Sequence, residues 1–198
     1  MSLIKFIFYI TALLIAQPSY AAALPKGILA QLPKGYEVMT FLSEELNDDK
    51  LTDYLVVVNK QNEKAVFDKT GEGSSRPLYI FTQNSNKSFS LARVNHDVVF
   101  AINDGGQCDP FMDGEDGLAI KNHFFTVQNG VAFGSHWNDF ITFKYDSKLK
   151  DWVFHKRVFE SWHLNTNEDP NADALVEDKP KVTKADIKHP IFFEKYKP

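Results

Sequence analysis

Residues 140–159 read FITFKYDSKLKDWVFHKRVF, a pattern that predicts a β-hairpin. Apolar and polar residues alternate in both halves, which is typical of strands with one face against a core. A polar stretch at 146–151 joins the halves and supplies the turn. The residues predicted to face the core are Ile141, Phe143 and Tyr145 in the first strand and Trp152, Phe154 and Val158 in the second.

Hairpin patterns extend over most of the chain. Residues 54–58 (YLVVV) are apolar throughout, which predicts a strand buried on both faces. A second hairpin is predicted from 123–127 to 131–133, with Asn129 and Gly130 in a tight turn because both tolerate positive φ. Further strands are predicted at 36–42, 78–81, 89–94 and 98–102, and one short helical segment at 27–32. We therefore expect a mostly β fold of antiparallel sheets built from hairpins, sandwich-like or partial-propeller-like, with few short helices.

The C-terminal part of the chain has a different composition. Residues 163–181 are polar and lack periodicity, which predicts an exposed, mobile loop. Apolar residues return at 191–193, and we expect them to dock on the body of the domain.

The N-terminal residues 1–21 are predicted to form a removable secretory signal peptide. One lysine precedes an apolar run at 6–16, and residues 19–21 (SYA) place small side chains where a signal peptidase cleaves. The run is about half of the roughly 20 apolar residues that a transmembrane helix needs. We expect cleavage without lipidation, because no cysteine lies near the cut, and a single periplasmic or secreted domain at 22–198. An uncleaved anchor and cleavage one or two residues later are the alternatives.

Charge and cysteine content limit the classes of partner. The net charge is −4 and no basic run occurs, which argues against nucleic acid and anionic membrane surfaces as partners. Cys108 is the only cysteine, so no disulfide can form within one chain. Two interpretations of Cys108 stay open: an inert buried thiol, or a thiol that pairs with another molecule.

The clearest chemical signal lies just before the YLVVV strand. Oxygen-bearing groups occur at alternate positions of a short loop, as a compact Ca²⁺ site requires, because Ca²⁺ takes six to eight oxygen ligands. The candidate ligands are the side chains of Glu45, Asn47, Asp49 and Asp53 and the main-chain carbonyl of Leu51. The alternative is an ordinary turn rich in Asn and Asp, which favour turns for backbone reasons alone.

The stretch from Glu45 to Val58 resembles the calcium loops of FG-GAP and VCBS-type β-repeats, which have the form D-L-N-G-D-G-x-x-D followed by an apolar strand. Glu45 replaces the first Asp of that motif, and Lys50 stands where the motif has Gly. Val56 occupies the position at which an EF-hand has its bidentate Glu, so the loop is not an EF-hand. The resemblance implies one bound Ca²⁺.

A wider resemblance links this chain to a family of uncharacterised exported bacterial proteins. The stretches that carry it are 51–58 (LTDYLVVV), 76–80 (RPLYI), Gly105-Gly106 with 109–111 (DPF), and 134–137 (GSHW). The family implies a β-rich periplasmic fold and no established activity.

A second acidic segment, residues 104–117 (DGGQCDPFMDGEDG), combines carboxylates with glycines. Its acids are Asp104, Asp109, Asp113, Glu115 and Asp116. One interpretation is a solvated turn. The other is a binding loop, since ligand contacts concentrate on loops held by a rigid scaffold. The candidate binding residues are Asp104, Asp109 and Asp113, together with His136 and Trp137.

The chain has no recognisable catalytic motif. Its six histidines form no H-x-x-x-H or H-E-x-x-H pair, and neither a G-x-S-x-G elbow nor a P-loop occurs. We therefore expect a non-enzymatic periplasmic binding protein, inhibitor-like or immunity-like, whose partner is another exported protein or an envelope component. The alternative function is a hydrolase of an envelope polymer that uses carboxylates of the 104–116 loop with His136.

Overall fold

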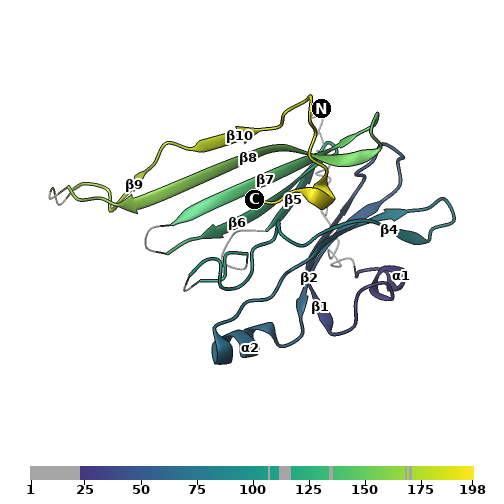
Figure 1. Cartoon of the computed structure of the whole chain (residues 1–198), viewed down its shortest axis with the longest axis horizontal. Coiled ribbons are helices and arrows are strands. Elements are labelled where there is room, and N and C mark those ends of the chain that lie inside the picture. The colour runs from purple at the N-terminus through teal and green to yellow at the C-terminus, as the bar shows by residue number, and fades with distance from the viewer. Residues whose placement is uncertain (1–22, 107, 112–116, 134–135, 168, 170) are drawn as a thin grey trace, which may run out of the picture.

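The structure, a computed structural model, consists of two antiparallel sheets packed face to face (Figure 1). The prediction of a mostly β, hairpin-built fold is confirmed, and its form is consistent with a sandwich. The described residues are 23–106, 108–111, 117–133, 136–167, 169 and 171–198. The predicted signal peptide lies outside them. Within the described part, no helix has the length and hydropathy that crossing a bilayer requires.

The first sheet has four strands in the order β1-β2-β3-β4. These are β1 (Tyr36–Glu44), β2 (Asp53–Lys60), β3 (Leu78–Gln83) and β4 (Phe89–Asn95). The predicted strand at 54–58 is buried on both faces: Leu55 and Val57 belong to the core between the sheets. Val56 belongs to a second apolar cluster on the opposite face, where Ile28 of the short helix α1 (Lys26–Leu29) covers the sheet.

The second sheet has six strands, with β10-β8-β7-β6-β5 in order and β9 paired to the end of β8. These are β5 (Leu118–Lys121), β6 (Phe124–Val131), β7 (Trp137–Asp146), β8 (Asp151–Leu164), β9 (Leu175–Glu177) and β10 (Lys181–Lys184). Helix α2 (Glu63–Thr70) and a 3-10 turn, η1 (Phe193–Lys195), complete the secondary structure of the described residues. The predicted hairpin at 140–159 is β7 and β8.

The C-terminal segment closes one side of the core, as its apolar residues predict. Phe193 is fully buried, and its ring lies 5.5 Å from that of Phe125 and 5.1 Å from that of Phe143. The side-chain amide of Asn95 donates to the carbonyl oxygens of Phe193 (2.5 Å) and Tyr196 (2.9 Å). These contacts attach the tail to the end of β4.

Two predicted elements around Asn129 were wrong. No turn forms at Asn129-Gly130, because β6 runs straight through both residues, and the turn lies instead at Asn122-His123, where φ is 52° and 62°. No strand forms at 98–102. The side chain of Asn129 takes the place of a neighbouring strand there: it accepts from Phe100 N (2.9 Å) and donates to the carbonyl of Val98 (3.0 Å).

An extra residue in β8 overturns one predicted orientation. The pairing shifts so that Thr142 faces Lys156 while Phe143 faces Phe154, which leaves His155 as a bulge. Because side chains alternate along a strand, one extra residue moves all later positions to the other face. Trp152 and Phe154 therefore face the core as predicted, and Val158 does not.

The predicted loop at 163–181 is exposed but not wholly irregular. β8 continues to Leu164, where it pairs with Leu175 at the start of β9. Figure 1 shows this end of β8, with β9 and β10, extending beyond the four-stranded sheet. The six-stranded sheet consequently carries a long end that the other sheet does not cover.

Candidate functional site

The candidate calcium loop, residues 45–53, connects β1 to β2 and is anchored from both sheets. Leu46 is fully buried in the core between the sheets. Its amide donates to Asp53 Oδ2 (3.1 Å), and its carbonyl oxygen accepts from Trp152 Nε1 (3.2 Å). The backbone of the loop is therefore fixed near its start by the strand that follows it and by the opposite sheet.

Alternate side chains of the loop fold back onto its backbone. Glu45 Oε1 accepts from Asn47 N (3.1 Å), Asn47 Oδ1 from Asp49 N (3.1 Å), and Asp49 Oδ1 from Leu51 N (2.8 Å). This repeated contact from residue i to residue i+2 lines up oxygens from successive candidate ligands along one compact turn.

Two residues of the loop adopt left-handed backbone conformations: Asp48 (φ 68°) and Lys50 (φ 66°). Left-handed φ values are costly for residues other than Gly, Asn and Asp. They fall at the fourth and sixth positions counted from Glu45, where the D-L-N-G-D-G motif has its glycines. Lys50 thus accepts a conformation for which glycine is better suited.

Asp53 closes the loop and is the most buried of its acids. Its side chain is fully buried, with Oδ2 bound to Leu46 N and Oδ1 accepting from Gln83 N (3.1 Å). The pKa of Asp53 is raised to about 6, mainly by burial; the two backbone hydrogen bonds oppose this effect, and the negative charges of Asp49 and Glu45 add to it. The cause is physical: a carboxylate removed from water beside other carboxylates is poorly stabilised as an anion.

The structure brings a histidine to this loop that the sequence analysis did not connect with it. His123, in the turn between β5 and β6, has Nδ1 3.3 Å from Glu45 Oε2 and Nε2 3.4 Å from Asp48 Oδ1. Its Nδ1 atom is buried and makes no hydrogen bond. One ligand atom from each of Glu45, Asp48 and His123 lies within 4.8 Å of the others, so the three could hold a metal ion together. No local spacing could have predicted this contact between distant segments.

In the acidic segment at 104–117, two of the candidate carboxylates, Asp104 and Asp109, make contacts within the domain. Asp109 forms a bidentate ion pair with Arg76, at 2.6 Å for both contacts. Arg76 is 1% exposed and also binds Glu63 Oε2 through Nε (2.9 Å) and Nη2 (2.7 Å). Asp104 Oδ2 accepts from Ala101 N (2.8 Å), which closes a turn. Asp113, Glu115 and Asp116 lie outside the described residues, and Cys108 is half-buried.

His136 and Trp137 contact different partners. The ring of His136 lies 4.4 Å from that of Trp162. Trp137 stacks on Phe159 with 5.9 Å between ring centroids and lies 6.0 Å from Phe100. We call these three half-buried rings, Phe100, Trp137 and Phe159, the aromatic strip.

Trp137 and Phe159 lie on the same face of the six-stranded sheet as the core residue Ile141, because side chains alternate along a strand. Phe159 pairs with Asp139, which is fully buried and binds Arg157 through two oxygens at 2.6–3.0 Å. Arg157 is 28% exposed. A hollow of about 290 Å³ lies beside the strip, lined by Arg157, Phe159, Lys181 and Thr183. The Nζ atom of Lys181 is 6.0 Å from the centroid of the Phe159 ring.

Compared with known proteins, the chain matches no family model, no curated protein and no solved structure.

Proposed function

We propose that this chain is an exported, non-enzymatic binding protein that contacts another exported protein or an envelope component through the aromatic strip, and that one Ca²⁺ in the 45–53 loop stabilises it. The observation that carries the proposal is the strip itself. The half-buried rings of Trp137 and Phe159, on β7 and β8, stack on each other, and Phe159 lines a hollow together with Arg157. Tyr, Trp, Phe and Arg are the residues enriched at the centres of protein interfaces.

The local electrostatics suit a rigid contact surface. The buried carboxylate of Asp139 holds the guanidinium of Arg157 in a fixed orientation with a bidentate geometry. An arginine fixed in this way loses little side-chain entropy when a partner binds. The neighbouring Trp137 and Phe159 rings are stacked and restrain each other in the same manner.

The calcium part of the proposal is supported by the backbone and by the charges of the loop. Left-handed residues at the two positions where the resembling motif has Gly give the loop a compact turn. The pKa of Asp53 is raised mainly by burial, with a smaller effect of the charges of Asp49 and Glu45, and a divalent cation in the loop would stabilise the ionised carboxylate. The carboxylate, amide and carbonyl oxygens of residues 45–53 suit calcium, whereas a softer metal would use the imidazole of His123 together with Glu45 and Asp48.

The described carboxylates give less support to a hydrolase. Glycoside hydrolysis requires two carboxyl groups free to act on substrate, about 5–10 Å apart. Asp109 is held in a bidentate ion pair by the buried Arg76, which gives this carboxylate a structural role.

The test is capture of a partner by the immobilised protein from an extract of the source organism's envelope fraction. We expect one protein or envelope component to bind in a stoichiometric amount. Phe159→Ala and Trp137→Ala should each weaken its capture at least tenfold, as truncation of interface hot spots does. Phe41→Ala, which alters a half-buried ring on the outer face of the other sheet, is the matched control. No stoichiometric partner, or equal capture by all variants, would contradict the proposal.

A further inference from the structure

The C-terminal segment forms an arch at the edge of the six-stranded sheet, next to β8. β10 pairs with β8, and the amide of Ala185 donates to the carbonyl of His155 (3.0 Å). The chain then leaves the sheet and returns at Ile191, whose carbonyl accepts from Phe154 N (2.8 Å). Residues 186–190 span the gap between these two attachments.

Asp186 stabilises the arch from within. Its Oδ1 accepts from Lys188 N (2.8 Å), and its Oδ2 lies 2.8 Å from Nδ1 of His189. The hydrogen bond from His189 holds the pKa of Asp186 below its usual value. These two contacts within residues 186–189 hold the turn of the arch together.

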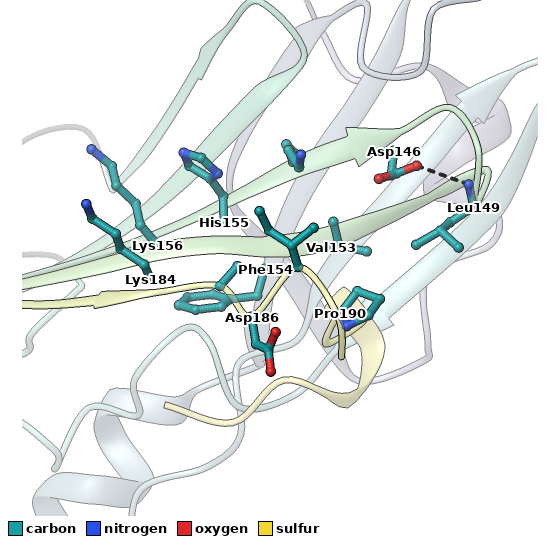
Figure 2. A pocket seen from close by; sticks show the side chains of 12 residues that line it. Asp146, Leu149, Val153, Phe154, His155, Lys156, Lys184, Asp186 and Pro190 are labelled. Carbon is teal, nitrogen blue, oxygen red and sulfur yellow. Dashed lines mark hydrogen bonds between the residues drawn. The ribbon is translucent and has the colours of Figure 1, made fainter.

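A pocket of about 430 Å³ lies between the arch and the β7–β8 hairpin (Figure 2). Small-molecule sites typically have volumes of roughly 300–1,000 Å³. The apolar part of the lining consists of Leu149, Val153, Phe154, Ile187 and Pro190. Ile187 is 93% exposed, so a large apolar side chain stands at the rim without an apolar cover.

Three lysines, Lys144, Lys156 and Lys184, surround the same pocket. Figure 2 shows Lys156 and Lys184 with His155 on one side of the pocket and Leu149 and Pro190 on the other. Burial lowers the pKa of His155, and the nearby charges of Lys144 and Lys156 lower it further. Within the described residues, none of the three ammonium groups forms an ion pair or a hydrogen bond.

The arrangement of the lysines is unfavourable by itself. Lys156 and Lys184 are direct cross-strand partners, and like charges placed directly opposite each other destabilise a sheet. The two carboxylates of the lining, Asp146 and Asp186, already accept hydrogen bonds within their own turns. The three ammonium groups of the lining therefore outnumber its two carboxylates, and none of the three is paired with either of them.

We propose that this pocket binds a small amphiphile with one compact anionic head group, whose head lies among Lys144, Lys156 and Lys184 and whose apolar part contacts Val153 and Ile187. Three ammonium groups beside two acids fit one anionic group rather than a polyanion. The apolar lining favours a hydrocarbon tail over a free inorganic anion. This site goes beyond the proposed function, because it uses neither the aromatic strip nor the 45–53 loop.

The test is calorimetric titration of the full-length protein with decanoate. The decanoate concentration is kept below the value at which decanoate forms micelles. We expect one site per chain, and comparable binding of decyl phosphate would assign the site to anionic heads in general. Decanol, which keeps the tail, and acetate, which keeps the head, should each bind at least tenfold more weakly. Equal binding of decanol, or equal binding of a hexaglutamate peptide, would overturn the proposal.

Charge variants separate the pocket from the rest of the surface. The triple variant Lys144→Gln, Lys156→Gln, Lys184→Gln should bind decanoate about 10–100-fold more weakly, since three charge-assisted contacts are lost. Its thermal stability should be unchanged or raised, because the repulsion between Lys156 and Lys184 is removed. The control is Lys34→Gln, Lys60→Gln, Lys87→Gln, which makes the same charge change at exposed lysines elsewhere. Equal binding by the two triple variants would refute the site.

A variant of the apolar wall tests the tail. Ile187→Asn should weaken decanoate binding at least fivefold, because a polar side chain replaces the apolar contact of the tail. It should not destabilise the fold, because the side chain of Ile187 is already 93% exposed. Val66→Asn, at a site 51% exposed on α2, is the matched control. Partner capture and calcium binding use other residues, so failure of decanoate to bind would leave the proposed function standing. Conversely, a protein that captured no partner and bound no calcium could still bind decanoate in the pocket.

Discussion

Trp152 of β8 donates its indole N–H to the carbonyl oxygen of Leu46, 3.2 Å away, and so joins the candidate cation loop to the opposite sheet. Both side chains are buried in the core between the sheets. Ordering of the loop and packing of the two sheets are therefore coupled. A ligand that fixes the loop should stabilise the whole domain rather than a local turn.

Calcium should raise the melting temperature of the protein. Extracellular calcium modules have dissociation constants of roughly 0.1–1 mM. At about 10 mM Ca²⁺, such a site contributes roughly 1.4–2.7 kcal/mol of stability. For a domain of this size that corresponds to a shift of about 3–10 °C, measured by calorimetry against the protein in chelator.

The loop variant for this measurement is Asp49→Asn, which removes a charge and keeps an oxygen to accept from Leu51 N. It should abolish most of the calcium shift with little effect in chelator. Asp68→Asn is the control, because Asp68 is an exposed acid in an i,i+4 ion pair with Lys64. An equal calcium shift in both variants would show that the ion binds elsewhere, and no shift in the parent protein would leave residues 45–53 as an ordinary turn.

Asp53 should make stability depend on pH when calcium is absent. Its folded pKa is about 6, above its usual value of 3.8, so the folded state holds this proton more tightly than the unfolded state does. The stabilisation is complete below about pH 4 and is lost as pH rises through about pH 6. The difference amounts to about 3 kcal/mol at most, at 1.4 kcal/mol per pKa unit.

Urea unfolding in chelator at a series of pH values measures this contribution. The free energy of unfolding should fall from pH 4 to pH 6.5 more steeply in the parent protein than in Asp53→Asn, which cannot titrate. Saturating calcium should flatten the dependence in the parent protein, because a bound cation favours the ionised carboxylate. Parallel pH profiles for the parent and Asp53→Asn would show that Asp53 does not titrate in this range.

The strands that the sequence predicts well are those in which local patterning and tertiary packing agree. Residues 140–159 alternate, and residues 54–58 are apolar throughout, so each segment alone indicates which faces are buried. His155 shows the limit of this reasoning. It looks like any polar strand residue, and only the pairing with β7 reveals that it is a bulge that moves Val158 to the other face.

The candidate sites depend even more on contacts between distant segments, which a local sequence pattern does not reveal. The alternating oxygens of 45–53 are local, so the sequence indicates a cation loop, but His123 reaches it only through the packing of the two sheets. Asn129-Gly130 has the composition of a tight turn, and the amide of Asn129 is instead used to bind residues 98 and 100. The pocket under the arch depends on where the tail leaves and rejoins β8, which no local pattern encodes.

Arg76 should be among the most sensitive residues of the protein. Arg76→Met would remove the cation beside the buried carboxylate of Glu63 and the partly buried carboxylate of Asp109, and breaking a buried ion pair in this way typically costs about 3–5 kcal/mol. The triple variant Arg76→Met, Glu63→Gln, Asp109→Asn should recover part of that loss, because no uncompensated charge remains. Lys64→Met, in an exposed ion pair, should change stability by less than about 1 kcal/mol. Urea unfolding measures all three, and a small effect of Arg76→Met would mean that water reaches the two acids.

Gly130 should be intolerant of any side chain because β7 approaches it closely. A Cβ atom at this position would lie 2.4 Å from Asn138 Oδ1 and 2.9 Å from the carbonyl oxygen of Trp137. The second of these atoms is backbone and cannot move without displacing β7, so Gly130→Ala should destabilise the protein by about 1–3 kcal/mol.

Gly27→Ala is the control, since its added Cβ would have no neighbour nearer than 3.8 Å. It lies in helix α1, where Ala is favoured over Gly, and it should leave stability unchanged or raise it by up to about 1 kcal/mol. Equal unfolding free energies for the two variants would show that β6 and β7 are not in contact at Gly130, and would reopen the assignment of a turn at Asn129-Gly130.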